Sequence, residues 1–207
     1  MRSAGCIIND IADKDFDSKV KRTKKRPIAF GKVSVKVGLL YSLILCLIAF
    51  GVLLQFNFYT IILALCSMPL AFSYPYMKRF TYWPQLFLGV TFNYGLILGW
   101  TAIYADLSIL PFVFYFGAIF WTLGYDTIYG FQDIKDDEII GVKSTSIKFK
   151  TNPKLFIFVC YSIFILFQII TGVLMEFDYY YFMGIIIIAC HLLIFQTLKL
   201  NISDTFM

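Results

Sequence analysis

Long apolar runs, separated by polar connections, make up most of this chain. The six longest lie at residues 33–56, 58–77, 83–104, 107–125, 155–175 and 179–198, and a shorter apolar run occupies residues 3–12. About 20 apolar residues in a helix cross the core of a bilayer, and a helix satisfies its own backbone hydrogen bonds there. The pattern therefore predicts an all-α fold: a multi-span transmembrane helix bundle with six full spans and an N-terminal helix stub. A membrane β-barrel would instead show alternating segments of about 10 residues, whereas these runs are continuous.

The composition supports a protein embedded in a lipid bilayer. Of the 207 residues, 59% are hydrophobic and only 15% are charged. Soluble domains usually carry about 25% charged residues, so a soluble fold of this length would leave much of the apolar surface exposed to water. We therefore expect an integral membrane protein whose helices contact lipid directly.

The basic residues predict how the spans are oriented. If the six runs alternate in direction, all 18 Lys and Arg residues fall on one side, together with the two long polar loops at 13–32 and 126–154. The opposite connections carry Asp106, Glu176 and Asp178. Because Lys and Arg mark the cytoplasmic ends of short loops, the long loops should face the cytoplasm from a bacterial inner membrane, or the matrix from a mitochondrial inner membrane. The net charge of +5 then fits an anionic membrane surface and needs no nucleic acid.

Each long polar loop has a stripe of carboxylates where an apolar run ends. Asn9, Asp13 and Asp17 are four residues apart, as are Asp133 and Asp137, and residues at this spacing share one face of a helix. Like charges at this spacing repel, so a cation should neutralise them. Oxygen ligands suit Mg²⁺, which is often shared with a substrate phosphate. The two stripes therefore predict a pair of Mg²⁺ ions that hold a diphosphate.

Basic residues accompany both stripes and could bind the remaining diphosphate oxygens. The candidates are Lys21, Arg22 and Arg26 after the first stripe, Lys78 and Arg79 at the end of the second span, and Lys143 after the second stripe. The alternative is a solvated face of long basic side chains at the membrane surface. We favour that alternative for most of the lysines, namely Lys14, Lys24, Lys25, Lys148, Lys150 and Lys154.

The position of the stripes suggests the shape of a substrate. Carboxylates at the end of an aromatic-rich bundle could hold the head of a polyprenyl diphosphate while its tail lies among the helices. Aromatic faces can also stabilise a carbocation, and the candidates near the predicted site are Tyr74, Tyr125 and Tyr129. Ordinary aromatic packing is the alternative, because 19% of the residues are aromatic.

Three stretches of the chain resemble one known family. "RSAGCIINDIADKDFDSKVKRTKKRPIA" resembles the first motif, NDxxDxxxD, of the UbiA superfamily of membrane prenyltransferases. "YDTIYGFQDIKDDEIIGVKSTSI" resembles the second motif, and "YPYMKRFTYWPQ" is similar to a linker between two helices. Together they most resemble the 4-hydroxybenzoate polyprenyltransferase branch, which makes the prenylated ring of ubiquinone.

This resemblance implies a role for each candidate residue. The implied metal ligands are Asn9, Asp10, Asp13, Asp17, Asp126, Asp133 and Asp137, of which Asp13, Asp17, Asp133 and Asp137 are the catalytic residues. The implied diphosphate-binding residues are Arg22, Arg26, Lys78, Arg79 and Lys143. Arg2 and Asn9, which lie seven residues apart on one helix face, are implied to bind the aromatic acid.

The family also implies the reaction. With Mg²⁺ as cofactor, diphosphate leaves the polyprenyl group, an allylic cation forms, and the 4-hydroxybenzoate carbon ortho to the phenol attacks that cation. No histidine lies near the predicted site, so a carboxylate or the released diphosphate would take the ring proton.

The resemblance is incomplete at both ends. Family members usually have nine transmembrane helices, so six spans and a stub predict one partial prenyltransferase domain over residues 1–207, truncated at both ends. An inactive fragment of such an enzyme is therefore an alternative, as is prenyl transfer to another aromatic acceptor. An ion-coupled transporter is a further alternative, since acids within membranes can couple ions, although these acids cluster at one end of the bundle. A phospholipid head-group transferase would place Gly and Arg inside a single motif, which we do not find.

Overall fold

A computed structural model describes residues 2–20 and 23–200 of the chain. Within these ranges every regular element is a helix. Six helical segments are long and apolar enough to cross a membrane, and they are Val35–Leu53, Phe58–Phe80, Pro84–Tyr104, Ile109–Gly130, Pro153–Leu174 and Tyr179–Lys199. The predicted fold, a multi-span transmembrane helix bundle, is confirmed.

Most of the elements are joined by short connections, and a longer polar segment separates Asp17 from Val35. In chain order they are α1 (Arg2–Ala12), α2 (Lys14–Asp17), α3 (Val35–Leu53), α4 (Phe58–Ser73), η1 (Tyr74–Tyr76), α5 (Met77–Phe80), α6 (Pro84–Asn93), α7 (Gly95–Tyr104), α8 (Ile109–Gly130), α9 (Ile134–Ile140), α10 (Thr145–Lys148), α11 (Pro153–Leu174), α12 (Tyr179–Ala189), the π-helical η2 (Cys190–Gln196) and α13 (Thr197–Lys199). The sequence itself sets several of the starts. The side chains of Ser34, Asn57, Ser108 and Asp178 each accept a hydrogen bond from a backbone amide in the first turn that follows.

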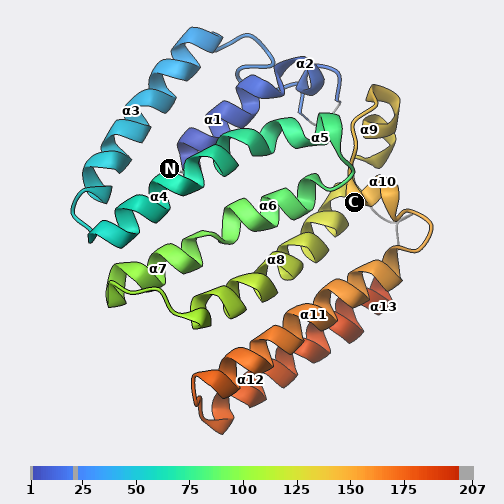
Figure 1. Cartoon of the computed structure of the whole chain (residues 1–207). Coiled ribbons are helices and arrows are strands. Elements are labelled where there is room, and N and C mark those ends of the chain that lie inside the picture. Colours follow the sequence, from blue (N-terminus) through green and yellow to red (C-terminus); the bar gives the residue numbers. More distant parts are fainter. Residues whose placement is uncertain (1, 21–22, 201–207) are drawn as a thin grey trace.

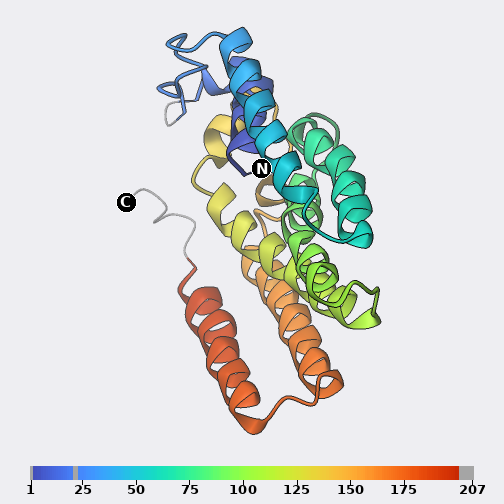
Figure 2. The ribbon, with the colours of Figure 1, turned by 90° about the vertical axis from the view of Figure 1, so that its left-hand side faces the viewer.

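Helix α8 is the centre of the bundle. It packs against α6 on one side and α11 on the other, and α1 packs against α3. Figures 1 and 2 show α11 and the segment from α12 to α13 side by side as an antiparallel pair at the C-terminal end. Large apolar side chains on the outer surfaces are exposed, such as Leu47 at 60% and Ile187 at 69%. Such surfaces are expected where helices face lipid.

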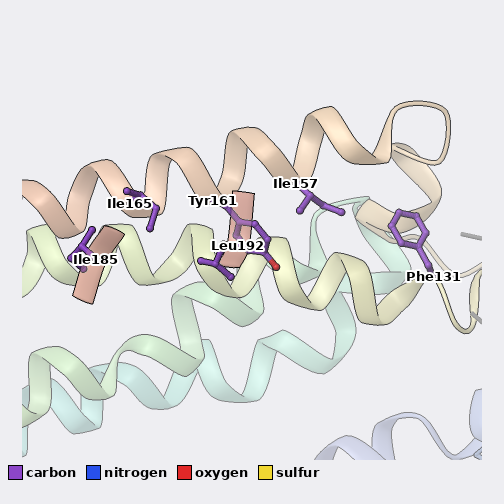
Figure 3. Packing of buried hydrophobic residues seen from close by; sticks show 6 residues of the cluster. All are labelled: Phe131, Ile157, Tyr161, Ile165, Ile185 and Leu192. Carbon is purple, nitrogen blue, oxygen red and sulfur yellow. The ribbon is translucent and has the colours of Figure 1, made fainter. Parts of the chain in front are cut away.

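Two glycines allow α8 and α11 to approach closely. A Cβ atom added at Gly124 would lie 2.6 Å from the Tyr161 ring, and one added at Gly117 would lie 2.8 Å from Phe167. Small residues at helix contacts permit this approach inside membranes. Beside this contact lies the buried cluster in Figure 3, which consists of Phe131, Ile157, Tyr161, Ile165, Ile185 and Leu192. This packing fixes the end of α8 that carries Asp126.

One of the predicted boundaries is wrong. The fourth span does not end at residue 125, because α8 continues to Gly130 and carries Asp126 within the helix. Thr127 in this added turn is fully buried, and its hydroxyl donates to Leu123 O at 2.6 Å. The third span is confirmed as one segment, Pro84–Tyr104, within which α6 ends at Asn93 and α7 begins at Gly95.

Candidate active site

A cavity of about 200 Å³ lies at the end of the bundle where both carboxylate stripes occur. Figure 1 shows α2, α5, α9 and α10 gathered at this end of the long helices. The candidate residues that line the cavity are Asn9, Asp13, Asp17, Arg26, Tyr74, Lys78, Asp126, Asp133, Asp137 and Lys143. The fold thus brings together two acidic stripes that are more than 100 residues apart in the printed sequence.

The two stripes share one local backbone geometry. Asp13 immediately precedes α2 with φ −95° and ψ 1°, and Asp133 immediately precedes α9 with φ −105° and ψ 3°. In each stripe the amide of the second aspartate donates to the carbonyl of the first: Asp17 to Asp13 at 2.8 Å, and Asp137 to Asp133 at 2.9 Å. Asp13 N also donates to Asn9 O at 2.9 Å, so the first stripe stays helical across the end of α1. The predicted spacing on one face is confirmed.

Basic side chains neutralise the first stripe. Lys78 Nζ lies 2.6 Å from Asp13 Oδ2, and Arg26 Nη1 lies 3.0 Å from Asp10 Oδ1 and 2.8 Å from Asp17 Oδ2. Asp13 and Asp17 are only 4% and 6% exposed. Burial raises the pKa of Asp13 above its usual value, although the Lys78 ammonium opposes the shift. Burial raises the pKa of Asp10 in the same way, against the effect of Arg26.

The stripes fit a magnesium ion that is shared with a phosphate ligand. The buried Oδ1 atom of Asp13 accepts no hydrogen bond within the described part of the chain, which leaves it available to a cation. All of the acidic donors are oxygens, which Mg²⁺ prefers. Among the described residues no three His, Cys, Asp or Glu side chains gather closely enough to form a complete metal cage. Magnesium held by one or two carboxylates, with substrate phosphates completing its coordination, matches this arrangement.

A buried hydroxyl network beside the cavity is a feature that the sequence analysis missed. Thr145 N donates to Gln85 Oε1 at 3.0 Å, the Thr127 and Thr145 hydroxyls lie 2.6 Å apart, and Ser146 Oγ donates to Thr127 O at 2.8 Å. These bonds attach the segment after α9 to α6 and α8, and thereby position Lys143. The run "KSTS" directly after the second stripe was the available signal.

Two predicted site residues, Arg79 and Asp10, do not line the cavity. Arg79 does not line it, because its guanidinium donates to Ala12 O at 2.6 Å and covers the Phe16 ring at 5.3 Å. Asp10 contacts Arg26 rather than the cavity. Arg22 falls outside the described residues.

The three aromatic candidates also differ in whether they line the cavity. Tyr74 lines the cavity, but Tyr125 and Tyr129 do not. Tyr125 packs on Trp121 with ring centroids 4.8 Å apart, and Tyr129 is 48% exposed. Arg2 is exposed at the start of α1 and acts electrostatically on the Tyr125 hydroxyl. Arg2 and Tyr125 therefore lie near each other but outside the carboxylate-lined cavity.

Comparison with known proteins shows the family of the chain. The profile of the UbiA prenyltransferase family matches residues 1–205. The chain belongs to the UbiA prenyltransferase family.

Among UbiA-family relatives, the 4-hydroxybenzoate polyprenyltransferase of Caenorhabditis elegans is 53% identical over 157 residues, which cover 74% of this chain and 44% of the relative. That of Dictyostelium discoideum is 42% identical over 197 residues, which cover 93% of this chain and 42% of the relative. Both are named as mitochondrial. This UbiA chain thus spans less than half the length of these two relatives.

Solved structures of UbiA proteins share the fold. A UbiA homolog from Aeropyrum pernix without ligand superposes with a TM-score of 0.79 at 22% identity, covering 99% of this chain and 81% of that chain. A UbiA homolog from Archaeoglobus fulgidus bound to GPP and Mg²⁺ gives a TM-score of 0.74 at 18% identity, covering 94% of this chain and 70% of that chain. At these identities the likeness concerns the arrangement of the helices.

Proposed function

We propose that this chain catalyses Mg²⁺-dependent transfer of a polyprenyl group from polyprenyl diphosphate to the ring of 4-hydroxybenzoate, a step of ubiquinone biosynthesis. The observation that carries the proposal is one cavity lined by both carboxylate stripes and by three basic side chains, at the end of an apolar bundle. The relatives named 4-hydroxybenzoate polyprenyltransferase favour 4-hydroxybenzoate over other aromatic acceptors. The UbiA homolog solved with GPP and Mg²⁺ supports the metal and the diphosphate.

The carboxylates on the cavity wall would hold the metal. Asp13 and Asp17 on one side, and Asp133 and Asp137 on the other, would ligate Mg²⁺, with Asn9 and Asp126 adjacent. When bound, the metal would neutralise charge on the diphosphate and make it a better leaving group.

The other residues of the cavity would bind and orient the substrate. Lys78, Arg26 and Lys143 supply positive charge to the diphosphate oxygens that the metal leaves uncovered. To do so Lys78 and Arg26 must exchange their present carboxylate partners for the ligand. The Tyr74 ring, also on the cavity wall, would stabilise positive charge on the allylic carbon. A carboxylate or the departing diphosphate would accept the ring proton.

The membrane provides the path for the polyprenyl tail. The cavity opens at the end of the bundle where the Lys and Arg residues gather, so the head group enters from that side and the tail lies along apolar helix surfaces. The relatives named as mitochondrial favour a mitochondrial inner membrane with the cavity facing the matrix.

The direct test is prenyl transfer to radiolabelled 4-hydroxybenzoate by membranes that contain the 207-residue chain. We expect labelled lipid product with Mg²⁺ and none with excess EDTA. The longer Dictyostelium discoideum relative, in the same membranes, serves as the positive control. Activity of that relative with no product from this chain would contradict the proposal and favour an inactive fragment.

A second prediction concerns the aromatic acid. We expect Arg2→Ala to raise the KM for 4-hydroxybenzoate about tenfold or more, because a charged hydrogen bond to the carboxylate would be lost. The KM for polyprenyl diphosphate should change little, since Arg2 lies outside the carboxylate-lined cavity. Initial rates with each substrate varied in turn would separate the two constants. An effect confined to polyprenyl diphosphate would refute this role.

A further inference from the structure

A second hollow, separate from the candidate active site, lies where the start of α11 meets the end of α13. Its volume is about 540 Å³, and its wall includes Lys150, Pro153, Lys154, Leu198 and Lys199. It shares no lining residue with the carboxylate-lined cavity. We propose that this hollow binds the phosphate head group of an anionic phospholipid from the surrounding bilayer.

The wall of the hollow is strongly basic. Lys154 Nζ donates to Leu198 O at 3.1 Å, and Lys199 Nζ lies 4.1 Å from the centre of the Phe195 ring. Across residues 2–20 and 23–200 neither of these lysines pairs with a carboxylate, whereas Lys150 pairs with Glu138 at 2.5 Å. Among the described residues these two ammonium groups thus have no carboxylate partner, and an anion bound in the hollow would supply a counter-charge.

The start of α11 adds to the positive potential. Asn152 precedes this 22-residue helix without a side-chain capping bond. The first amides of such a helix have no partner inside the helix, and its N-terminal end carries a partial positive charge. Because Pro153 and Lys154 both line the hollow, that end of α11 reinforces the two lysines rather than acting alone.

The position in the membrane favours a phospholipid over a soluble anion. The transmembrane segments that begin at Pro153 and end at Lys199 meet the same membrane surface, and they run side by side in Figures 1 and 2. Leu155 and Leu198 next to the lysines are each 65% exposed. A head group at the lysines would place its acyl chains along these leucines. Basic pockets between helices at this membrane side are suited to acidic head groups.

The test is equilibrium binding of fluorescent phosphatidylglycerol, labelled on an acyl chain, to the full chain in a neutral maltoside detergent. Phosphatidylcholine with the same label is the comparison, since it has the same phosphate but no net charge. We expect phosphatidylglycerol to bind at least tenfold more tightly. Lys154→Gln combined with Lys199→Gln should weaken its binding about 25-fold, because each lysine near an anionic lipid surface contributes roughly fivefold.

Two control variants and two competitors make the result specific. Lys154→Arg with Lys199→Arg keeps the charge and should keep the binding, which shows that the hollow tolerates substitution. Lys32→Gln with Lys36→Gln removes two exposed lysines on the same membrane side and should leave the binding unchanged. Millimolar inorganic phosphate, or polyprenyl diphosphate with Mg²⁺, should not displace the lipid.

Four outcomes would contradict the proposed lipid site. Equal binding of the two lipids, or an equal loss in the Lys32 and Lys36 variant, would overturn the proposal in favour of non-specific surface attraction. Displacement by inorganic phosphate would identify a free-anion site instead. Displacement by polyprenyl diphosphate would make the hollow part of the substrate site.

Discussion

Replacement of Asp13 by alanine is expected to lower the rate of prenyl transfer by about three orders of magnitude, and Asp133→Ala should have a similar effect. Each change removes one carboxylate from a stripe on the cavity wall. The loss of a group that stabilises developing charge, directly or through a metal, costs about 10²–10³ in rate even for a single neutral donor. In Asp13→Ala the Lys78 ammonium would also lose its partner at 2.6 Å.

Metal binding gives a second readout that does not depend on turnover. Mn²⁺ can replace Mg²⁺ at oxygen sites, so its binding to the full chain can be followed by electron paramagnetic resonance. We expect weaker Mn²⁺ binding in Asp13→Ala and Asp133→Ala. The matched control is Asp15→Ala, because Asp15 is exposed and does not line the cavity. Rates and Mn²⁺ affinities near those of the unchanged chain in Asp13→Ala would refute the two-stripe site.

Lys78→Met is expected to change metal binding and substrate binding in opposite directions. Lys78 now neutralises a buried carboxylate that a metal would also need. Without Lys78 the Asp13 charge is uncompensated, so Mn²⁺ should bind about three- to tenfold more tightly in the absence of diphosphate. The kcat/KM for polyprenyl diphosphate should instead fall about 100-fold, because the cation that we propose contacts the diphosphate oxygens is lost.

The pH of this experiment matters. Burial raises the pKa of Asp13 and Lys78 lowers it, so removal of Lys78 raises the pKa further and lets protons compete with Mn²⁺ as the pH falls. Binding should therefore be measured at a pH well above this raised pKa. Lys36→Met, a change at an exposed lysine, is the control. A parallel fall in Mn²⁺ affinity and in kcat/KM would show that Lys78 only maintains the local structure.

Much of this protein was determined by patterns within short stretches of the sequence. The length of each apolar run determined the spans, because the thickness of the bilayer requires about 20 helical residues. The spacing of four residues within each stripe determined which carboxylates share a face. The oxygen-only side chains of the stripes led to the prediction of Mg²⁺. Each of these follows from local geometry or from chemistry that does not depend on the position of other segments.

The tertiary structure alone decided which cation meets which carboxylate. Lys78 and Arg79 are neighbours in the sequence, yet Lys78 pairs with Asp13 while Arg79 turns away to Ala12 O. Their positions in the sequence do not distinguish them, because both follow the second span. Their separation depends on how α5 approaches the junction of α1 and α2, and this is a contact between segments more than 60 residues apart in the printed sequence.

The position of Asp126, on the other wall of the cavity, also depends on contacts between distant segments. Asp126 belongs to a helix whose position depends on close packing at Gly117 and Gly124, where α11 approaches. The Thr127, Thr145 and Gln85 bonds then attach the next segment. Helix packing depends on the combined shapes of side chains from distant segments, so no local pattern specifies it. The sequence by itself determined the chemical groups of the site, and the packing of α8 between α6 and α11 decided where those groups meet.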